Sequence, residues 1–336
     1  MTINALGVVP GRPVDPGVVK GLFSERIAQM PLWQKATSLA PTITMQATSG
    51  TMPVDGTYRG VNLSSDPDLA TAKSSGGDVY SDLAVSLDTE AYALERYTLG
   101  KFEHSFLKAR QLMLDNGVDI EAHVADVFAA KAAALHYYKV STAITTSGNY
   151  ASGYAADGGN ITSASFDIIA LMETARNALI KAQAWDGMSP VTVFVSNDVV
   201  PYIQKLTQVT NRIGTANSTH PTPDAVGAFF ADYLGVPVNY VRDDGWYTAA
   251  NGTITATSSG CIAFFVPRTG TFGRGLVGTL TGAGLESGIL DMRTQDNQAL
   301  AGGGQDIYAD AYYKVHVENI NGSGATSGYL AHTLLS

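Results

Sequence analysis

The hydrophobic pattern is most regular between residues 118 and 145, in a stretch without Pro or Gly that is rich in Ala. Alanine loses little conformational freedom on entering a helix, so this composition favours a helix. Its apolar side comprises Ile120, Val124, Val127, Phe128, Leu135 and Tyr138. Asp119 can cap the first turn, and Lys131, which interrupts the apolar side, must reach solvent or a carboxylate. We predict a spine helix over residues 119–144, roughly 39 Å long at 1.5 Å per residue.

The first residues of the chain contain apolar side chains but no second element that could cover them. Residues 18–29 form a short amphipathic segment, and residues 42–47 have the pattern of a strand. Apolar groups that cannot be buried locally are usually buried on a neighbouring molecule. We therefore expect residues 1–48 to form an arm on an adjacent subunit, with Leu22, Phe23 and Trp33 as candidate intersubunit contacts.

A long segment rich in Gly and Ser follows the arm. Residues 57–63 and 80–87 alternate like strands and can pair with each other. A two-stranded ribbon of this length is marginally stable alone in water, so we expect residues 49–87 to lie on another subunit. The candidate contacts on this ribbon are Tyr58, Arg59 and Lys73.

The remaining residues alternate between helical and extended patterns, which predicts an α+β fold. Helices are expected at residues 99–114, at 166–184 with Thr162 or Ser163 as the cap, at 197–206 and at 225–234. Strands are expected at residues 190–196, 236–241, 260–267, 290–293 and 307–317, with one more short strand near the end and a hairpin-type turn at 243–253. The strands at 290–293 and 307–317 face each other across a glycine-rich loop.

Composition narrows the possible functions. The net charge of −9 argues against a basic nucleic-acid reader. The single cysteine rules out a disulfide framework, and only 15% of the residues are charged, which indicates that much of the surface is buried against something or lies in loops. No signal peptide and no apolar run of about 18 residues is visible, so no membrane span is expected.

Candidate chemistry is sparse. The glycines of Gly273-x-Gly275-x-x-Gly278 match a dinucleotide-binding string, but no helix pattern follows, so we interpret them as strand and turn. The histidines form no metal-binding pair and are expected at half-buried or exposed positions. Cys261 lies in an apolar strand, where a buried thiol is inert. We expect no catalytic residue, cofactor or metal site.

The order of these parts resembles the major capsid protein of tailed bacteriophages, a fold shared with encapsulin shells. Residues 85–103 resemble the junction between that family's extended loop (E-loop) and its peripheral domain (P-domain), and residues 118–140 with 148–153 resemble its spine helix and exit loop. Residues 234–244 and 260–275 resemble paired strands of its axial domain (A-domain). The resemblance implies an N-terminal arm at 1–48, an E-loop at 49–87, a P-domain at 88–152 and 270–314, and an A-domain at 153–269 and 315–336.

The resemblance implies a structural subunit, and not an enzyme, of an icosahedral viral capsid. Such subunits self-assemble into pentamers and hexamers that enclose double-stranded DNA without specific recognition. The expected partners are other copies, a separate scaffolding protein, a portal and possibly a decoration protein, with assembly in the host cytoplasm. Two alternatives are an encapsulin-type shell that encloses cargo and an enzyme with a mobile lid at residues 50–87.

Three expectations about assembly follow. Deleting residues 1–30 should leave a folded monomer that does not assemble, and mature particles should contain an essentially full-length chain. Some relatives join a loop lysine to an asparagine of a neighbour, and the candidates here are Lys73 and Asn297 beside Asp296. Because Lys73 lies among small polar residues, its amine should stay hydrated, and we expect no such link.

Overall fold

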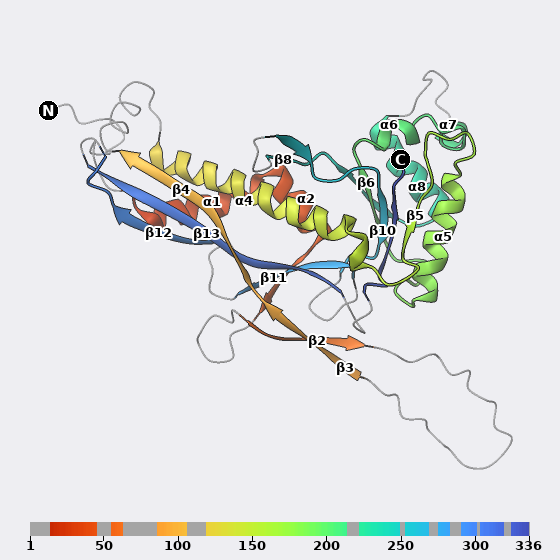
Figure 1. The fold of residues 1–336 in the computed structure, drawn as a ribbon, viewed down its shortest axis with the longest axis horizontal. Coiled ribbons are helices and arrows are strands. Elements are labelled where there is room, and N and C mark those ends of the chain that lie inside the picture. Colours follow the sequence, from red (N-terminus) through yellow and green to blue (C-terminus); the bar gives the residue numbers. More distant parts are fainter. Residues whose placement is uncertain are drawn as a thin grey trace, which may run out of the picture.

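The computed structural model describes residues 14–45, 55–62, 86–105, 119–213, 222–248, 253–268, 275–282, 290–300, 303–318 and 324–335. Its central element is the helix α4 (Ile120–Thr145), which begins at the cap residue Asp119 and confirms the predicted spine helix. The side chain of Asp119 accepts hydrogen bonds from the backbone N–H groups of Glu121 and Ala122. Lys131 is exposed, so it reaches solvent as expected. One five-stranded sheet lies along each half of α4 (Figure 1).

The first sheet is built around one long strand, β13 (Gly304–Val317). The strands β12 (Leu290–Asp296) and β11 (Val277–Gly282) pair with β13 in antiparallel register, as does β4 (Glu95–Ser105). The strand β1 (Thr42–Met45) adds to β11 in parallel. The predicted pairing of the strands near 290–293 and 307–317 is therefore confirmed, and Gly278 lies in a strand, as expected for the end of the glycine string.

The predicted helix at residues 99–114 is wrong over its first half. Residues 99–105 belong to β4, and residues 106–118 lie outside the described part of the chain. Leu99 and Phe102 do recur at helical spacing, but a break in the β4–β13 register next to Gly100 places both on the side facing α4. Gly100 has φ of 132°, a backbone conformation that favours glycine. Pairing along β13 outweighs the local helical pattern here.

The second sheet has the order β5-β14-β10-β6-β7. Its strands are β5 (Ala155–Asp157), β14 (Gly328–His332), β10 (Ile262–Phe265), β6 (Val191–Ser196) and β7 (Val238–Asp243). The helices α5 (Ile168–Lys181) and α8 (Pro223–Leu234) cover one face, and the second half of α4 with α2 (Pro31–Leu39) covers the other. Because both faces are covered, every residue of β6 is buried.

The smaller elements complete the chain. They are α1 (Pro16–Gln29), β2 (Asp55–Asn62), β3 (Ser86–Ala93), the 3-10 turn η1 (Ser147–Asn149), α6 (Val200–Ile203), α7 (Thr207–Ile213), β8 (Trp246–Thr248) and β9 (Ile254–Ala256). The helix expected at 197–206 is reduced to the single turn α6, and α5 is capped by Asp167 in place of Thr162 or Ser163. The hairpin expected after β7 is present as the antiparallel pair β8–β9. In the described part of the chain, no helix is long and apolar enough to cross a bilayer.

A buried carboxylate joins the spine helix to the second sheet. Asp243, at the end of β7, accepts hydrogen bonds from Tyr137 Oη at 2.6 Å and Ser141 Oγ at 3.2 Å, both on α4. It also accepts from Thr257 Oγ1 at 2.7 Å and from Ser258 Oγ, which follow β9. An ionised carboxylate away from water is tolerated only when its oxygens accept several such bonds. Asp243 therefore fixes the angle between α4, the end of β7 and the hairpin.

We predict that Asp243→Ala lowers the free energy of unfolding by about 3 kcal/mol or more, because several buried hydroxyl groups lose their acceptor together. The matched control is Asp244→Ala. The Asp244 carboxylate is about one-third exposed and pairs with Lys35 and Arg242, so its loss should cost at most about 1 kcal/mol. Chemical denaturation of both variants measures the difference. Equal effects of the two substitutions would contradict this role for Asp243.

Candidate functional site: assembly surfaces

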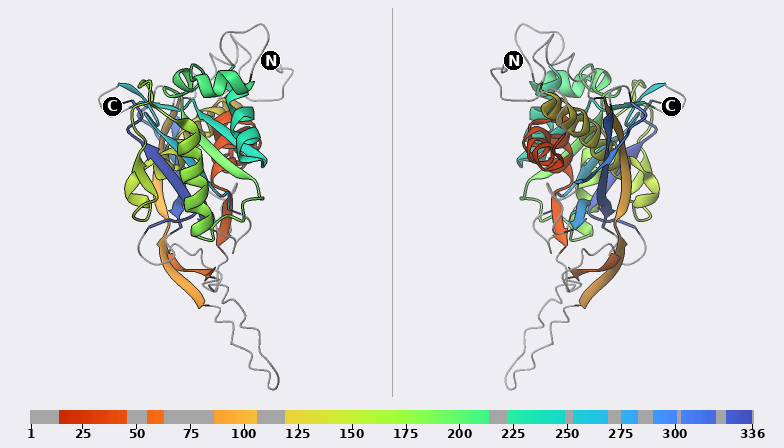
Figure 2. Two further views of the ribbon diagram at one scale, coloured as in Figure 1. Left: turned by 90° about the vertical axis from the view of Figure 1, so that its right-hand side faces the viewer. Right: turned by 90° about the vertical axis from the view of Figure 1, so that its left-hand side faces the viewer.

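The most prominent surface feature is a ribbon formed by β2 and β3. These strands pair with each other from Asp55↔Ala93 to Asn62↔Ser86, and with no third strand among the described residues. A ribbon was expected from residues 57–63 and 80–87, but the second strand runs over Ser86–Ala93, and residues 80–85 lie outside the described part of the chain. The ribbon projects away from both sheets (Figures 1 and 2). Tyr58 and Arg59 lie opposite Glu90 and Thr89 in its register, whereas Lys73 lies outside the described residues.

The ribbon is directly continuous with the first sheet. Only Leu94 separates β3 from β4, so the same chain forms the ribbon and an outer strand of the sheet. Leu94 is buried and packs with Ile43 of β1 and Leu280 of β11. This apolar contact anchors the base of the ribbon to the strands of the sheet.

The described part of the N-terminal arm, residues 14–45, packs on its own chain, which corrects the expectation that it has no local partner. Val19, Phe23 and Ile27 of α1 are buried against α4, in a cluster that Leu22 and Trp33 border as partly buried side chains. The covering helix was missed because it lies about a hundred residues further along the chain. Phe23 is therefore part of the core of this chain, and deleting residues 1–30 would uncover α4, so we no longer expect that deletion to leave a stable monomer.

The next helix of the arm, α2, closes over a buried histidine of the spine helix. His136 of α4 is fully buried, its ring lies 4.7 Å from that of Trp33 and 5.2 Å from that of Tyr313, and its Nε2 lies 2.9 Å from Thr279 Oγ1. Burial lowers the pKa of His136 to about 3. His104 and His316 are also buried, so the expectation that every histidine is half-buried or exposed is wrong.

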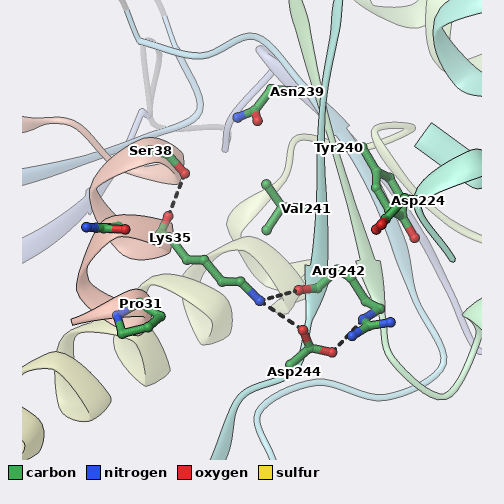
Figure 3. Close-up of a pocket in the computed structure, with 10 residues that line it drawn as sticks. Pro31, Lys35, Ser38, Asp224, Asn239, Tyr240, Val241, Arg242 and Asp244 are labelled. Carbon is green, nitrogen blue, oxygen red and sulfur yellow. Dashed lines mark hydrogen bonds and ion pairs between the residues drawn. The ribbon is translucent and has the colours of Figure 1, made fainter. Parts of the chain in front are cut away.

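Two ion pairs that share Asp244 hold α2 to the edge of the second sheet. Lys35 Nζ lies 2.9 Å from Asp244 Oδ2, and Arg242 Nε lies 2.6 Å from Asp244 Oδ1 (Figure 3). Lys35 also donates to the backbone carbonyl of Arg242 at 3.3 Å, which occupies an acceptor of the edge strand β7. These side chains line a groove of about 460 Å³ between α2 and β7.

Asn297, the remaining candidate contact, follows β12 and is tied to its own chain. Its Nδ2 donates to both carboxylate oxygens of Asp306 at 3.1 Å, and Lys101 Nζ lies 3.5 Å from Asp306 Oδ2 and 2.6 Å from Glu103 Oε1. The hydrogen bond to Glu103 raises the pKa of Lys101, with Asp306 acting in the same direction. The lysine that shares Asp306 with Asn297 is thus held as a charged ammonium.

The structure thus brings Leu22, Phe23 and Trp33 together, leaves Tyr58 and Arg59 on the ribbon, and places Asn297 at the end of β12. Cys261 is buried next to Ser196, and burial raises the pKa of its thiol to about 12, which keeps it protonated and inert. In the ranges that the structure describes, no group of acidic, histidine or cysteine side chains could hold a metal ion.

No protein-family model matches the sequence, and no curated protein matches it. Among solved structures, a phage-related protein from Bordetella bronchiseptica is similar at 14% identity, covering 96% of this chain and 98% of that chain with a TM-score of 0.65. The mature capsid of bacteriophage PhiM1 is less similar, at 11% identity, with 88% of this chain and 86% of that chain covered and a TM-score of 0.49. An encapsulin from Synechococcus elongatus is also less similar, at 12% identity, with 90% of this chain and 87% of that chain covered and a TM-score of 0.47. The chain has the α+β architecture expected for the tailed-phage major capsid fold, and the first similarity extends over nearly its whole length.

We predict that His136 makes the protein acid-sensitive. The pKa is about 3 in the folded state against an ordinary value of 6.5, so the unfolded state binds this proton first. The contribution of neutral His136 to the free energy of unfolding is therefore fully present above pH 6.5. It should fall by about 1.4 kcal/mol per pH unit as the pH drops from 6.5 towards 3. Denaturation of the wild type and His136→Phe at several pH values measures this slope.

The variant should lose part of the slope and keep the remainder that comes from His316, whose pKa burial lowers to about 4. His123 lies exposed on the same helix and provides the control substitution, His123→Asn. An unchanged slope in His136→Phe would show that folding does not lower the pKa of His136.

Proposed function

We propose that this protein is the structural subunit of an icosahedral viral capsid, assembled from many copies around double-stranded DNA. The observation that carries the proposal is the ribbon β2–β3, which pairs only with itself among the described residues and projects from the folded body. Such a ribbon is marginal in water, and a neighbouring subunit would supply the surface that it lacks. The fold shared with a phage-related protein supports the same function.

The charge and the chemistry of the chain fit this function. The net charge of −9 favours enclosure of DNA without a specific binding surface. The one cysteine is buried, and the groups with shifted pKa values are spread along the chain from Glu95 to Tyr329, some buried and some exposed. These features favour a structural subunit over an enzyme with a lid at residues 50–87. We propose pentamers and hexamers as its building units and the virion capsid as its location, with a separate scaffolding protein and a portal as partners.

Negative-stain electron microscopy of the purified protein tests this proposal. We predict closed particles or rings for the wild type, and monomers for a variant in which residues 57–91 are replaced by Asn-Gly. Thr57 lies opposite Ala91 in the ribbon, so a two-residue turn can join the shortened strands. The variant should unfold at the temperature of the wild type, because the ribbon pairs with no third strand in the described part of the chain.

Normal particles from the shortened variant, or only monomers from the wild type, would contradict the proposal. The contents of wild-type particles separate the alternatives. Nuclease-protected DNA supports a viral capsid, and a single co-purifying cargo protein supports an encapsulin-type shell.

We also predict that the subunits are joined without covalent bonds. The amide of Asn297, which would be the target of attack, is bound to Asp306, and the raised pKa of Lys101 keeps its amine protonated, so this amine is not ready to attack that amide. Mature particles boiled in detergent should give one band near 35.3 kDa on a denaturing gel. A ladder of multimers that disappears in Lys73→Ala, and persists in the control Lys101→Ala, would prove this prediction wrong.

A further inference from the structure

The helix α2 is joined to the buried side chain of His136 at both of its ends. Near its start, the Trp33 ring lies 4.7 Å from the imidazole, which Tyr313 of β13 contacts from another side at 5.2 Å. At its end, Thr279 of β11 forms the link. The Thr279 Oγ1 lies 2.9 Å from His136 Nε2 and donates to the backbone carbonyl of Ala40 at 3.3 Å. Any change in the imidazole is therefore felt along the whole of α2.

These hydrogen bonds fix where the imidazole carries its proton. Because the Thr279 hydroxyl donates its own proton to Ala40, its oxygen accepts from His136, so Nε2 holds the ring proton. A second proton has to add at Nδ1. That nitrogen is buried and has no hydrogen-bond partner in the described part of the chain. A charged imidazolium would thus contain a buried N–H group without an acceptor, which is costly.

The groups that face His136 offer no compensating charge. Trp33 and Thr279 do not titrate, and burial raises the pKa of Tyr313, which therefore stays neutral. Among the described residues, the next charged groups lie beyond Tyr313, around the ring of Tyr97: they are Glu95, Lys139 and Lys314. Lys35, the charged residue of α2, is engaged with Asp244. Burial alone thus acts on His136, and it lowers the pKa to about 3.

Of the elements around His136, α2 can leave without unfolding a sheet. The helix α4 belongs to the cores of both sheets, and β11 and β13 are paired within the first sheet. By contrast, α2 has nine residues and follows Met30, whose extended backbone already separates it from α1. It packs on the second half of α4 through Ala36 and Leu39. The helix α2 is therefore the element that costs least to displace.

We propose that α2 (Pro31–Leu39) is released from α4 at acidic pH, through protonation of His136 by solvent, while both sheets stay folded. When α2 moves away, water reaches Nδ1 and accepts its proton in a hydrogen bond. Release also withdraws Lys35 from the backbone carbonyl of Arg242 and so frees the edge of β7. The inference goes beyond the proposed function and does not rest on it, because it concerns a single chain.

The expected pH range follows from the two states of the imidazole. Its pKa is about 3 with α2 docked, against an ordinary value of 6.5 in water, so the open state binds the proton first. The ratio of open to docked α2 should therefore rise about tenfold per pH unit as the pH falls from 6.5 towards 3. Burial raises the pKa of Asp244, but its bonds to Arg242 and Lys35 outweigh burial and lower that pKa below the ordinary 3.8. The ion pair is thus kept above pH 4, where His136 controls the opening.

Pepsin cleavage measures the open population, because the protease cuts only chain that has left the helix. Mass spectrometry counts cuts within residues 31–40 of the full chain. The same cuts in a synthetic peptide of residues 27–43 correct for the pH dependence of pepsin itself. We predict that the ratio of the two rates rises roughly 30-fold between pH 5.5 and 4. Cuts within β6 should stay rare over this range, because β6 is buried in the second sheet.

Three variants assign the effect to its cause. His136→Phe keeps a ring beneath Trp33 but takes up no proton, so its cleavage ratio should not change with pH. His136→Gln, whose amide can donate to Thr279, repeats this test with a polar side chain. The matched control is Asp244→Asn, which removes the ion pair to Lys35. It should raise the ratio by at most about fivefold at every pH and leave the dependence on pH intact.

A constant ratio between pH 5.5 and 4 in the wild type overturns the proposal, as does the same rise in both His136 variants. Cuts in β6 that increase together with those in α2 also overturn it, because they would show that the whole chain unfolds. Each of these outcomes is measured on single chains and leaves the proposed function intact, whereas the absence of particles from the wild type contradicts only the proposed function.

Discussion

The structure depends on one helix that serves two sheets. The first half of α4 packs on the first sheet through residues such as Val124 and Phe128, and the second half packs on the second sheet through Tyr137 and Val140. Alanines at positions 125, 129 and 132 are buried in the cluster that α4 forms with α1 and the first sheet, and their small side chains allow these neighbours to approach the helix backbone closely. Any change in the tilt of α4 would disturb both cores at once. The hydrogen bonds from Tyr137 and Ser141 to the buried carboxylate of Asp243 hold the helix in one orientation.

Charge pairing controls the outer face of the first sheet. Asp306 and Asp310 of β13 are buried although they point away from α4, because Lys101, Arg96 and Asn297 cover them. Lys314 pairs with Glu95 in the same way at the other end of β4. Pairs of this kind, made in part by exposed side chains, contribute little stability each, but they fix the register between β4 and β13. The strand that continues into the ribbon is thereby held in one alignment.

The elements with a strong local pattern could be predicted from the sequence. The spine helix is an example, since its alanine-rich run begins at a clear cap, and so are the paired strands β12 and β13. The sequence does not indicate which residues, far apart along the chain, pack or pair with each other in the fold. The helical spacing of Leu99 and Phe102 concealed a strand whose pairing is with residues more than two hundred positions away.

The candidate intersubunit contacts were predicted only in part, again because their distant partners could not be identified from the sequence. Phe23 was expected on a neighbouring molecule because nothing near it in the sequence could cover it, yet α4 does so. The donors to Asp243 come from residues 137, 141, 257 and 258, and no spacing rule connects them.

Leu94 gives the ribbon the mechanics of a lever. It is the single residue between the ribbon and β4, and it is buried against Ile43 and Leu280, so it acts as a fulcrum seated in the sheet. The eight residues of β3 reach about 27 Å beyond it. A rotation of only 10° at the fulcrum would move the far end of β3 by about 5 Å, nearly the full ~4.8 Å spacing between neighbouring strands. In the shell proposed above, subunits joined by such levers would follow different local curvatures while their folded bodies keep a single conformation.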